Sequence, residues 1–478
     1  MKQWLSILRE ALAGSSRDFT SGSLGTALFL LAVPMILEMI MESIFSVVDI
    51  FFVAKQGHDA VAVVVLTESM LALVFALGIG LSVSATATVS RRIGEDDPEG
   101  AAHSAAHAIY LGIAVSLLVS VIGVAFAPHF LTALGADPAV IKLGTPYTHI
   151  MLGGNAAIVF LFLLNAIFRG AGDPSVSMRV LYFANLLNIF LAPCFVFGPD
   201  IFGVLHIGAP QWLINVWPFP HLGVTGAAVG TTIGRGAGVL LAARYLMRPG
   251  GRITLHRRHW KLDAPVLSAL VKIAAPAVLQ FAIGTISWSL LVRVIAGFGS
   301  EALAGYGIGL RVIIFVLLPA VGMSNAASTL VGQNLGAGKP DRAEASVWRA
   351  AYVNAVILGT GGLFLLLFSH AIVGAFTTEP AVLDYGATTL HIVSYGFLFY
   401  AFGMVLESSF NGAGDTWTPT LLNLFVFWVV EIPLAYLLSY HFGLGAAGVP
   451  WAITIAFSLL AICSAIIFKR GKWKEKVV

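Results

Sequence analysis

Three carboxylates share one stripe of a long apolar stretch near the start of the chain. Glu38, Glu42 and Asp49 lie in residues 26–52, a stretch long enough to cross a bilayer as a helix. At about 100° per residue, Glu42 lies about 40° and Asp49 about 20° around the helix from Glu38. A carboxylate at membrane depth costs roughly 2.5 kcal/mol or more, so it needs a partner or a water-filled cavity. The spacing therefore predicts a polar wall that faces the protein interior.

Such a wall could carry ions. Neighbouring acids in a low-dielectric cavity disfavour double ionisation, so one of them can hold a proton at neutral pH and release it when its surroundings change. We expect Asp49, assisted by Glu42 and Glu38, to alternate between a protonated and a cation-bound state. Glu68, in the next apolar stretch, adds a fourth acid. The alternative is that these acids only make structural hydrogen bonds to neighbouring helices.

The composition indicates a membrane protein. Of the 478 residues, 58% are hydrophobic and only 11% are charged, whereas soluble proteins carry about 25% charged residues. The apolar runs are long and continuous, which predicts helices rather than a barrel. The net charge of +3 gives no argument for a nucleic-acid partner. Cys194 and Cys463 lie in apolar runs and are expected to be buried thiols rather than a disulfide or a metal site.

The apolar stretches predict about twelve spans. We place them at 26–52, 60–88, 101–127, 139–168, 175–197, 223–246, 265–297, 301–331, 344–369, 381–410, 416–440 and 445–468. Lys and Arg gather in alternate loops and in the tail, so the positive-inside rule predicts that both termini are cytoplasmic. The predicted organisation is an N-terminal segment (1–22), a first lobe (23–247), a linker (248–263), a second lobe (264–468) and a basic tail (469–478).

The two halves of the chain repeat each other. LAVP, VSRRIG and FRGAGD in the first half recur 242 residues later as IAAP, VGQNLG and FNGAGD, at 31–34, 89–94 and 168–173 and at 273–276, 331–336 and 410–415. Near the end of each half, LGVTGAA at Leu222 recurs as LGAAGVP at Leu444, which is 222 residues later. Six spans per copy make this a parallel repeat. Two such bundles hold substrate in a cleft near the bilayer midplane in alternating-access transporters.

The two halves differ in charge. Under the 242-residue displacement, Glu38 corresponds to Gln280, Glu42 to Gly284 and Asp49 to Leu291. The acidic stripe therefore belongs to the first half alone. We expect the proton or cation site to lie in the first lobe.

The motifs resemble those of the multidrug and toxic compound extrusion (MATE) family over residues 20–470. The resemblance rests on PMILEMIMESIFSVVDIFFVAKQG, GIGLSVSATATVSRRIGE, NAIFRGAGD and LGVTGAAVGTTIG, and on GFGSEALAGYGIGLRV, VGQNLGAGKPDRA and FNGAGDTWTP in the second half. It implies an all-α integral membrane fold with twelve helices in two six-helix lobes that form a V. It also implies export of organic cations and other drugs in exchange for H⁺ or Na⁺.

The resemblance assigns roles to individual residues. Asp49 matches a first-helix aspartate implicated in cation coupling, and Asn188 and Thr231 match polar residues near that site. Ala192 and Gly284 stand where some members have further acids, which puts a copied Na⁺ site at Asp49 and Asn188 in doubt. Other glutamates of the first lobe are expected to supply the missing carboxylates. The expected coupling site comprises Asp49, Glu42, Glu38, Glu68, Asn188 and Thr231.

The second half has its own intramembrane acids, Glu407 and Glu431. Either could attract an organic cation to the cleft. Glu407 could instead make a structural pairing near the FNGAGD loop, and Glu431 could instead pair with Arg293 or Arg311. Aromatic side chains in the same spans could stack on flat cations. The candidate substrate contacts are Asn185, Glu407, Glu431 and Tyr400.

These observations predict a secondary active antiporter rather than an enzyme. It would export organic cations, drugs or related metabolites by alternating access, with H⁺ or Na⁺ as the coupling ion and no other cofactor. We expect a monomer in the bacterial cytoplasmic membrane. The runner-up is a lipid-linked saccharide or lipid flippase. A flippase of lipid-linked sugars should line its cleft with Arg and Lys to hold pyrophosphate. An intramembrane enzyme is the third alternative, although the His and Cys residues do not cluster in the sequence.

Overall fold

The computed structural model describes residues 2–204, 206, 208, 210, 214 and 216–478, without the side chains of residues 2–4, 46, 47 and 49. Every regular element in this part of the chain is helical. Among the described residues, eleven helices are long and apolar enough to cross a membrane, and the bent pair α14 (Pro380–Ser394) and α15 (Phe397–Gly412) makes up to 12. The all-α membrane fold with about twelve spans is thereby confirmed.

The long helices form two lobes. The first lobe contains α2 (Leu24–Val53), α3 (His58–Gly94), α4 (Pro98–Ala133), α5 (Pro138–Gly153), α6 (Ala156–Gly170), α7 (Pro174–Phe197) and α10 (Val224–Met247). The second lobe contains α11 (Ala264–Ala296), α12 (Ser300–Gly336), α13 (Pro340–Gly374), α14, α15, α16 (Trp417–Asn423), α17 (Ile432–Tyr436) and α18 (Gly448–Lys469). Two π-helical segments, Leu424–Glu431 and Leu437–His441, flank α17. The short helix α1 (Lys2–Ala13) precedes the first lobe in sequence, and the short helix α8 (Ile201–Val204) lies between α7 and α10.

Repeat-related prolines set where several helices begin. Helices α4 and α13 start at Pro98 and Pro340, and α5 and α14 start at Pro138 and Pro380. Proline suits the first helical position because its ring fixes φ there and its missing N–H would have no partner in the helix anyway. At α4, the Asp97 side chain also accepts a hydrogen bond from the backbone N–H of Gly100 at 2.8 Å, which caps the helix. Both halves therefore use proline to begin the same helices.

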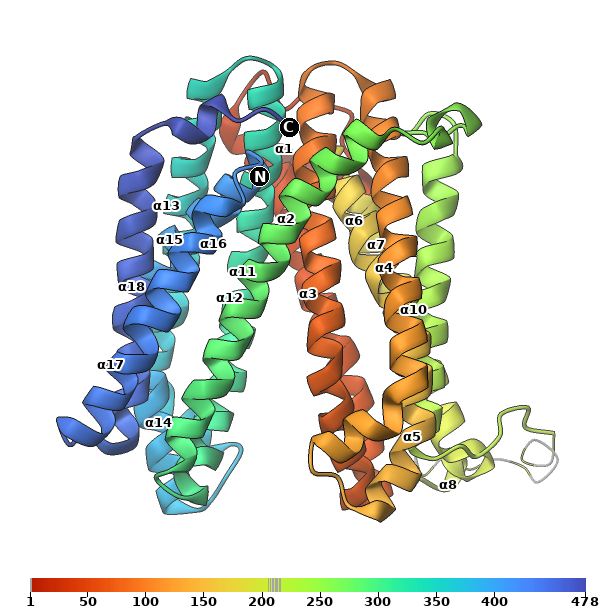
Figure 1. Ribbon diagram of the computed structural model, residues 1–478, viewed down its shortest axis with the longest axis vertical. Helices are drawn as coiled ribbons and strands as arrows, with labels where there is room; N and C mark the ends of the chain where they lie inside the picture. The colour runs from red at the N-terminus through yellow and green to blue at the C-terminus, as the bar shows by residue number, and fades with distance from the viewer. Residues whose placement is uncertain (1, 205, 207, 209, 211–213, 215) are drawn as a thin grey trace.

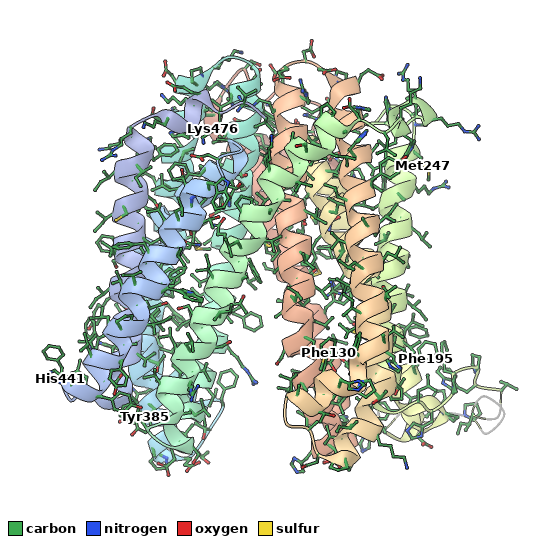
Figure 2. The ribbon with its side chains drawn as sticks, in the orientation of Figure 1. Phe130, Phe195, Met247, Tyr385, His441 and Lys476 are labelled. Carbon is green, nitrogen blue, oxygen red and sulfur yellow. The ribbon has the colours of Figure 1, made fainter. Side chains whose placement is uncertain are left out.

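The lobes meet at one end of the molecule and diverge at the other. Figure 1 shows the first-lobe helices and the second-lobe helices as two bundles that come together at the end where both chain termini lie. Figure 2 places Met247 and Lys476 at this end, and Phe130, Phe195, Tyr385 and His441 at the opposite end. We call the first of these the terminal end. The V shape that the family resemblance implies is the shape observed.

The VSRRIG and VGQNLG motifs make the contact between the lobes at the terminal end. A Cβ atom added to Gly94 of α3 would lie 2.0 Å from the Gln333 carbonyl oxygen of α12. A Cβ added to Gly336 of α12 would lie 2.1 Å from the Arg91 carbonyl oxygen of α3. Because Gly94 corresponds to Gly336 and Arg91 to Gln333, the crossing is symmetric with respect to the repeat. Only glycine allows the two backbones to approach this closely.

Candidate functional site

Glu38 is paired with an arginine of its own lobe. Its side chain, on α2, is 1% exposed, and its Oε1 contacts Nη1 of Arg169, which lies near the end of α6 in the FRGAGD motif. The Arg169 side chain is 9% exposed. Glu38 therefore faces the interior, and its negative charge meets a buried positive charge.

Glu42 has a second arginine as its partner. Arg235 of α10 places Nη1 3.0 Å from Oε1 of Glu42, and its side chain is 5% exposed against 21% for Glu42. The Arg235 guanidinium also lies over the ring of Phe45, 4.2 Å from the centroid. A cation over an aromatic face is attracted by the ring quadrupole. Glu42 is thus part of an ion pair that joins α2 to α10.

These two pairs correct one part of the sequence analysis. We expected Glu38 and Glu42 to help Asp49 in a negatively charged pocket, and neither arginine was assigned a role. The signal was present in the sequence, because Arg235 lies inside a predicted span and Arg169 lies one residue beyond the end of another, where a guanidinium needs a partner as much as a carboxylate does. The spacing of the glutamates alone could not show that arginines of the same lobe neutralise their charges.

The other first-lobe candidates are only partly described. The side chain of Asp49 lies outside the described part of the structure, although its backbone belongs to α2. Glu68 is half-buried on α3. Asn188 and Thr231 lie together, with Asn188 Nδ2 donating to Thr231 Oγ1 at 2.9 Å between α7 and α10. Asn185, one turn earlier on α7, donates to the Met41 carbonyl at 2.8 Å and so ties α7 to α2.

In the second lobe, Glu407 of α15 lies among amides. Its carboxylate is beside the side chains of Gln280 of α11 and Asn423 of α16, and its Oε1 is buried. Asn411 Nδ2 in turn donates to Gln280 Oε1 at 3.3 Å. Glu407 therefore belongs to a polar cluster that links three helices and that contains no arginine from the described part of the chain.

Glu431 lies among hydroxyl groups. It is 2% exposed, and Ser287 Oγ of α11 donates to its Oε2 at 2.8 Å. Tyr400 is 4% exposed, and its ring centroid lies 4.8 Å from that of Phe457. The alternative in which Glu431 pairs with Arg293 or Arg311 is not observed, because a serine occupies the contact.

The buried acids of the two lobes thus differ in whether a basic side chain lies beside them. Glu38 and Glu42 each lie within 4.0 Å of an arginine nitrogen, whereas no Lys, Arg or His nitrogen among the described residues lies that close to Glu407 or Glu431. A buried carboxylate without a counter-charge is costly, so such a group favours binding a proton or a cation. The second lobe therefore offers two groups that can exchange either ion.

Comparisons with known proteins agree with this architecture. The family model MatE matches residues 34–194 and 276–437, one segment in each half of the chain. The chain is 26% identical to the probable multidrug resistance protein YoeA of Bacillus subtilis, over 95% of this chain and 96% of that one. It is also 26% identical to the multidrug export protein MepA of Staphylococcus aureus, over 91% of each chain.

Solved structures share the fold. The crystal structure of a MATE protein in the straight conformation superimposes with a TM-score of 0.86 at 23% identity, over 96% of this chain and 98% of that chain. A MOP superfamily transporter from Pyrococcus furiosus gives the same TM-score, identity and coverage. At this level of identity, the likeness supports the fold and leaves the chemistry to the residues themselves.

Proposed function

The chain belongs to the MatE family, and from this premise we propose that it is a secondary active antiporter that exports organic cations, drugs or related metabolites. The names of its relatives, multidrug resistance protein and multidrug export protein, support drug export. We propose H⁺ or Na⁺ as the coupling ion and the bacterial cytoplasmic membrane as its location, with both termini on the cytoplasmic side.

One observation carries the antiport proposal. Glu407 and Glu431 are acids within membrane spans, and no basic side chain among the described residues lies within 4.0 Å of either. We propose that these two groups bind a proton or a cationic substrate in turn, so that loading of one ion releases the other. Ion exchange of this kind needs no nucleotide and no enzyme chemistry.

We propose a second coupling site in the first lobe, at Asp49 with Asn188 and Thr231. The hydrogen bond between Asn188 and Thr231 supports a polar centre there. Glu38 and Glu42, held by their arginines, would position α2 beside this centre rather than titrate. In this proposal α2 repacks when Asp49 changes its charge, and Pro34 gives the helix a place to bend.

Alternating access follows from the arrangement of the lobes. The glycine crossing of α3 and α12 holds the lobes together at the terminal end, while they diverge at the opposite end. With cytoplasmic termini, we propose that this conformation releases substrate to the outside. Opening of the crossing would expose the space between the lobes to the cytoplasm instead.

Among the described residues, the acidic stripe of the first lobe offers no unpaired arginine to a flippase substrate. A lipid-linked pyrophosphate needs arginine or lysine side chains with free donors. The buried arginines Arg169 and Arg235 are both engaged by glutamates. We therefore favour a cationic substrate.

The test is transport in proteoliposomes with a fluorescent organic cation, with an H⁺ gradient or a Na⁺ gradient imposed separately. We expect one gradient to drive the cation across the membrane, and Glu407→Gln, Glu431→Gln and Asp49→Asn each to remove most of that transport. Glu379→Gln, at an exposed loop position, is the matched control and should transport normally. Gradient-independent transport by the unaltered protein would refute antiport, whereas full transport by the variants would refute the assigned residues.

A further inference from the structure

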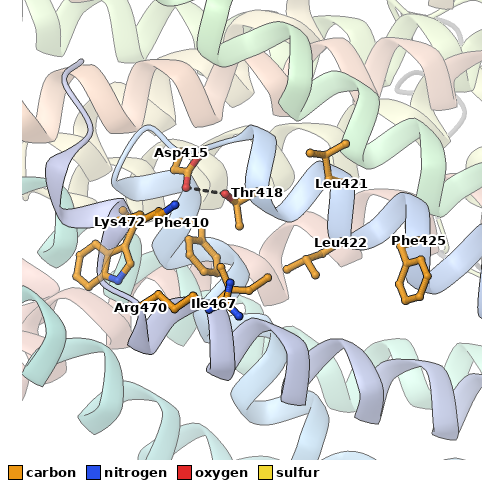
Figure 3. A pocket seen from close by; sticks show the side chains of 10 residues that line it. Phe410, Asp415, Thr418, Leu421, Leu422, Phe425, Ile467, Arg470 and Lys472 are labelled. Carbon is orange, nitrogen blue, oxygen red and sulfur yellow. Dashed lines mark hydrogen bonds between the residues drawn. The ribbon is translucent and has the colours of Figure 1, made fainter.

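Each lobe has a groove at the same place. The second-lobe groove has a volume of about 340 Å³ and is lined by Phe410, Asp415, Thr418, Leu421, Leu422, Phe425, Ile467, Arg470, Lys472 and Trp473 (Figure 3). The first-lobe groove has a volume of about 260 Å³ and runs between α7 and the end of α10, beside the linker. Both therefore lie where the last helices of a lobe meet at the terminal end.

The linings of the two grooves correspond under the repeat. Phe168 and Asp173 of the first groove correspond to Phe410 and Asp415 of the second, 242 residues later. Arg248 corresponds in the same way to Arg470, 222 residues later, which is the displacement found near the ends of the two halves. The duplicated fold thus builds the same feature twice, with an arginine at the same position each time.

One end of the second-lobe groove is cationic. Arg470 and Lys472 are exposed just beyond the end of α18, and no carboxylate among the described residues lies within 4.0 Å of either side chain. The Asp415 carboxylate in the lining is already satisfied. Lys476 Nζ lies 3.1 Å from its Oδ1, and Thr418 Oγ1 donates to its Oδ2 at 2.7 Å. This end therefore has two positive charges available for an anion.

The other end of the groove is apolar. Leu421 and Phe425 are 57% and 50% exposed on consecutive turns of the helix that begins at Trp417. Figure 3 shows Leu421, Leu422 and Phe425 extending along this helix away from Asp415, Arg470 and Lys472. Since α16 begins and α18 ends here, we expect the charged end to lie at the membrane surface and the apolar wall to run into the bilayer.

We propose that the second-lobe groove binds an anionic phospholipid. Its phosphate would lie between Arg470 and Lys472, and one acyl chain would lie along Leu421 and Phe425. Guanidinium groups bind phosphate through paired hydrogen bonds, and basic pockets between membrane helices on one face bind anionic headgroups. The charge at one end and the apolar wall at the other match the two parts of such a lipid.

The first-lobe groove has a cationic end like the second-lobe groove but a different apolar wall. Arg248 supplies the corresponding cation, but Arg179 stands at the position of Leu421, with its guanidinium 5.6 Å from the centre of the Tyr245 ring. A charged side chain thus replaces part of the wall that would contact an acyl chain. We therefore expect the second-lobe groove to bind a lipid with full-length acyl chains with higher affinity than the first-lobe groove.

The test is native mass spectrometry of the full-length protein in detergent, with phosphatidylglycerol or phosphatidylcholine added. We expect phosphatidylglycerol to bind and Arg470→Gln/Lys472→Gln to weaken that binding about tenfold or more, because both charge-assisted contacts are removed. The matched control is Lys469→Gln/Arg349→Gln, which removes two exposed charges that do not line the groove. The control should bind phosphatidylglycerol like the unaltered protein.

Two further readouts make the assignment specific. Glycerophosphoglycerol, which has the headgroup without acyl chains, should bind about tenfold or more weakly than the lipid, because the apolar wall then has no ligand. Thermal unfolding of the double variant in detergent without lipid should match the unaltered protein, since both side chains are exposed. Equal binding by the variant, equal binding of phosphatidylcholine or equal binding of the headgroup alone would overturn the proposal.

Discussion

Asn411 donates a hydrogen bond to Gln280 at 3.3 Å, at the repeat positions that Arg169 and Glu38 occupy in the first lobe. Both contacts join the first long helix of a lobe to the end of its fourth span. The contact is therefore common to the two lobes, but it is an ion pair in one and a pair of neutral amides in the other. Asn411 stands where the first lobe has Arg169. Glu407, which lies beside Gln280, therefore has no arginine from this position near it.

The neutral pair of Asn411 and Gln280 suggests a direct test of the ion pair between Arg169 and Glu38. Glu38→Gln leaves Arg169 buried without a counter-charge, and breaking a buried ion pair in this way typically costs about 3–5 kcal/mol. The double variant Glu38→Gln/Arg169→Asn reproduces the second-lobe pair and should recover most of that stability. The measurement is thermal unfolding in detergent, followed by size-exclusion chromatography of the heated protein.

Arg169→Asn alone is the complementary control, since it leaves Glu38 buried without its partner and should also destabilise the protein. If the double variant unfolded at the same low temperature as Glu38→Gln, the two residues would not act as an exchangeable pair. An unaltered unfolding temperature for both single variants would show that the ion pair contributes nothing to stability.

Much of the fold could be predicted from the sequence because it depends on local and periodic signals. Apolar stretches of bilayer length give the spans, and the displacement from Pro34 to Pro276 gives the two lobes. The inward orientation of Glu38 and Glu42 follows from helical periodicity. These properties need no knowledge of which helices are neighbours.

The partners of the buried acids could not be predicted because they depend on how the helices pack. Arg169 and Arg235 are 131 and 193 residues from the glutamates they contact. Periodicity places each side chain on a face but does not say which faces meet. For the same reason, the sequence suggested Arg293 or Arg311 as the partner of Glu431, whereas the packing of α11 places Ser287 beside it.

The Arg235 contacts predict that lysine is a poor replacement there. Arg235 both pairs with Glu42 and lies over Phe45, and a lysine would keep the charge but lose the planar group that does both. We expect Arg235→Lys to lower the free energy of unfolding by about 1–2 kcal/mol. Arg244→Lys, at an exposed position of the same helix, is the matched control. Denaturant or thermal unfolding in detergent measures both, and equal values for the two variants would contradict this account.

The crossing of α3 and α12 predicts that glycine is required at its centre. In Gly336→Ala the new Cβ would collide with the Arg91 carbonyl, so the two helices must separate and the lobes should open at the terminal end. Gly307→Ala on the same helix meets nothing within 4 Å and serves as the control. The measurement is the distance between spin labels at Glu95→Cys and Asp341→Cys, with both native cysteines replaced by alanine.

We expect the Gly336→Ala variant to show a longer distance, or a new population at a longer distance, and the Gly307→Ala variant to match the unaltered protein. Gly94→Ala should reproduce the effect from the other helix, because its contact is the repeat counterpart. An unchanged distance distribution in both crossing variants would mean that the glycines do not hold the lobes together.

The tail after α18 forms a further link between the lobes. Trp473 is 1% exposed and stacks on Phe468 with ring centroids 4.5 Å apart. Three residues later, the Lys476 carbonyl accepts a hydrogen bond from Arg91 Nη2 of the first lobe at 2.8 Å. The hydrogen bond from Lys474 to Glu344 raises the pKa of the Lys474 ammonium, so this contact is retained below the usual lysine pKa of 10.5 and is lost as the pH rises through the raised value.

Removing the buried indole should therefore loosen both the tail and the interface between the lobes. Trp473→Ala leaves a cavity and is expected to cost about 3–5 kcal/mol, as large-to-small changes at buried aromatic positions do. Trp473→Phe keeps an aromatic ring beside Phe468 and leaves a much smaller cavity, although it loses the Nε1 hydrogen bond to the Phe468 carbonyl, so it should recover most of the stability. The same spin-label pair should report a longer distance in Trp473→Ala and a nearly normal one in Trp473→Phe. If Trp473→Ala lowered the unfolding temperature but left the distance between the lobes unchanged, the tail would not link the lobes.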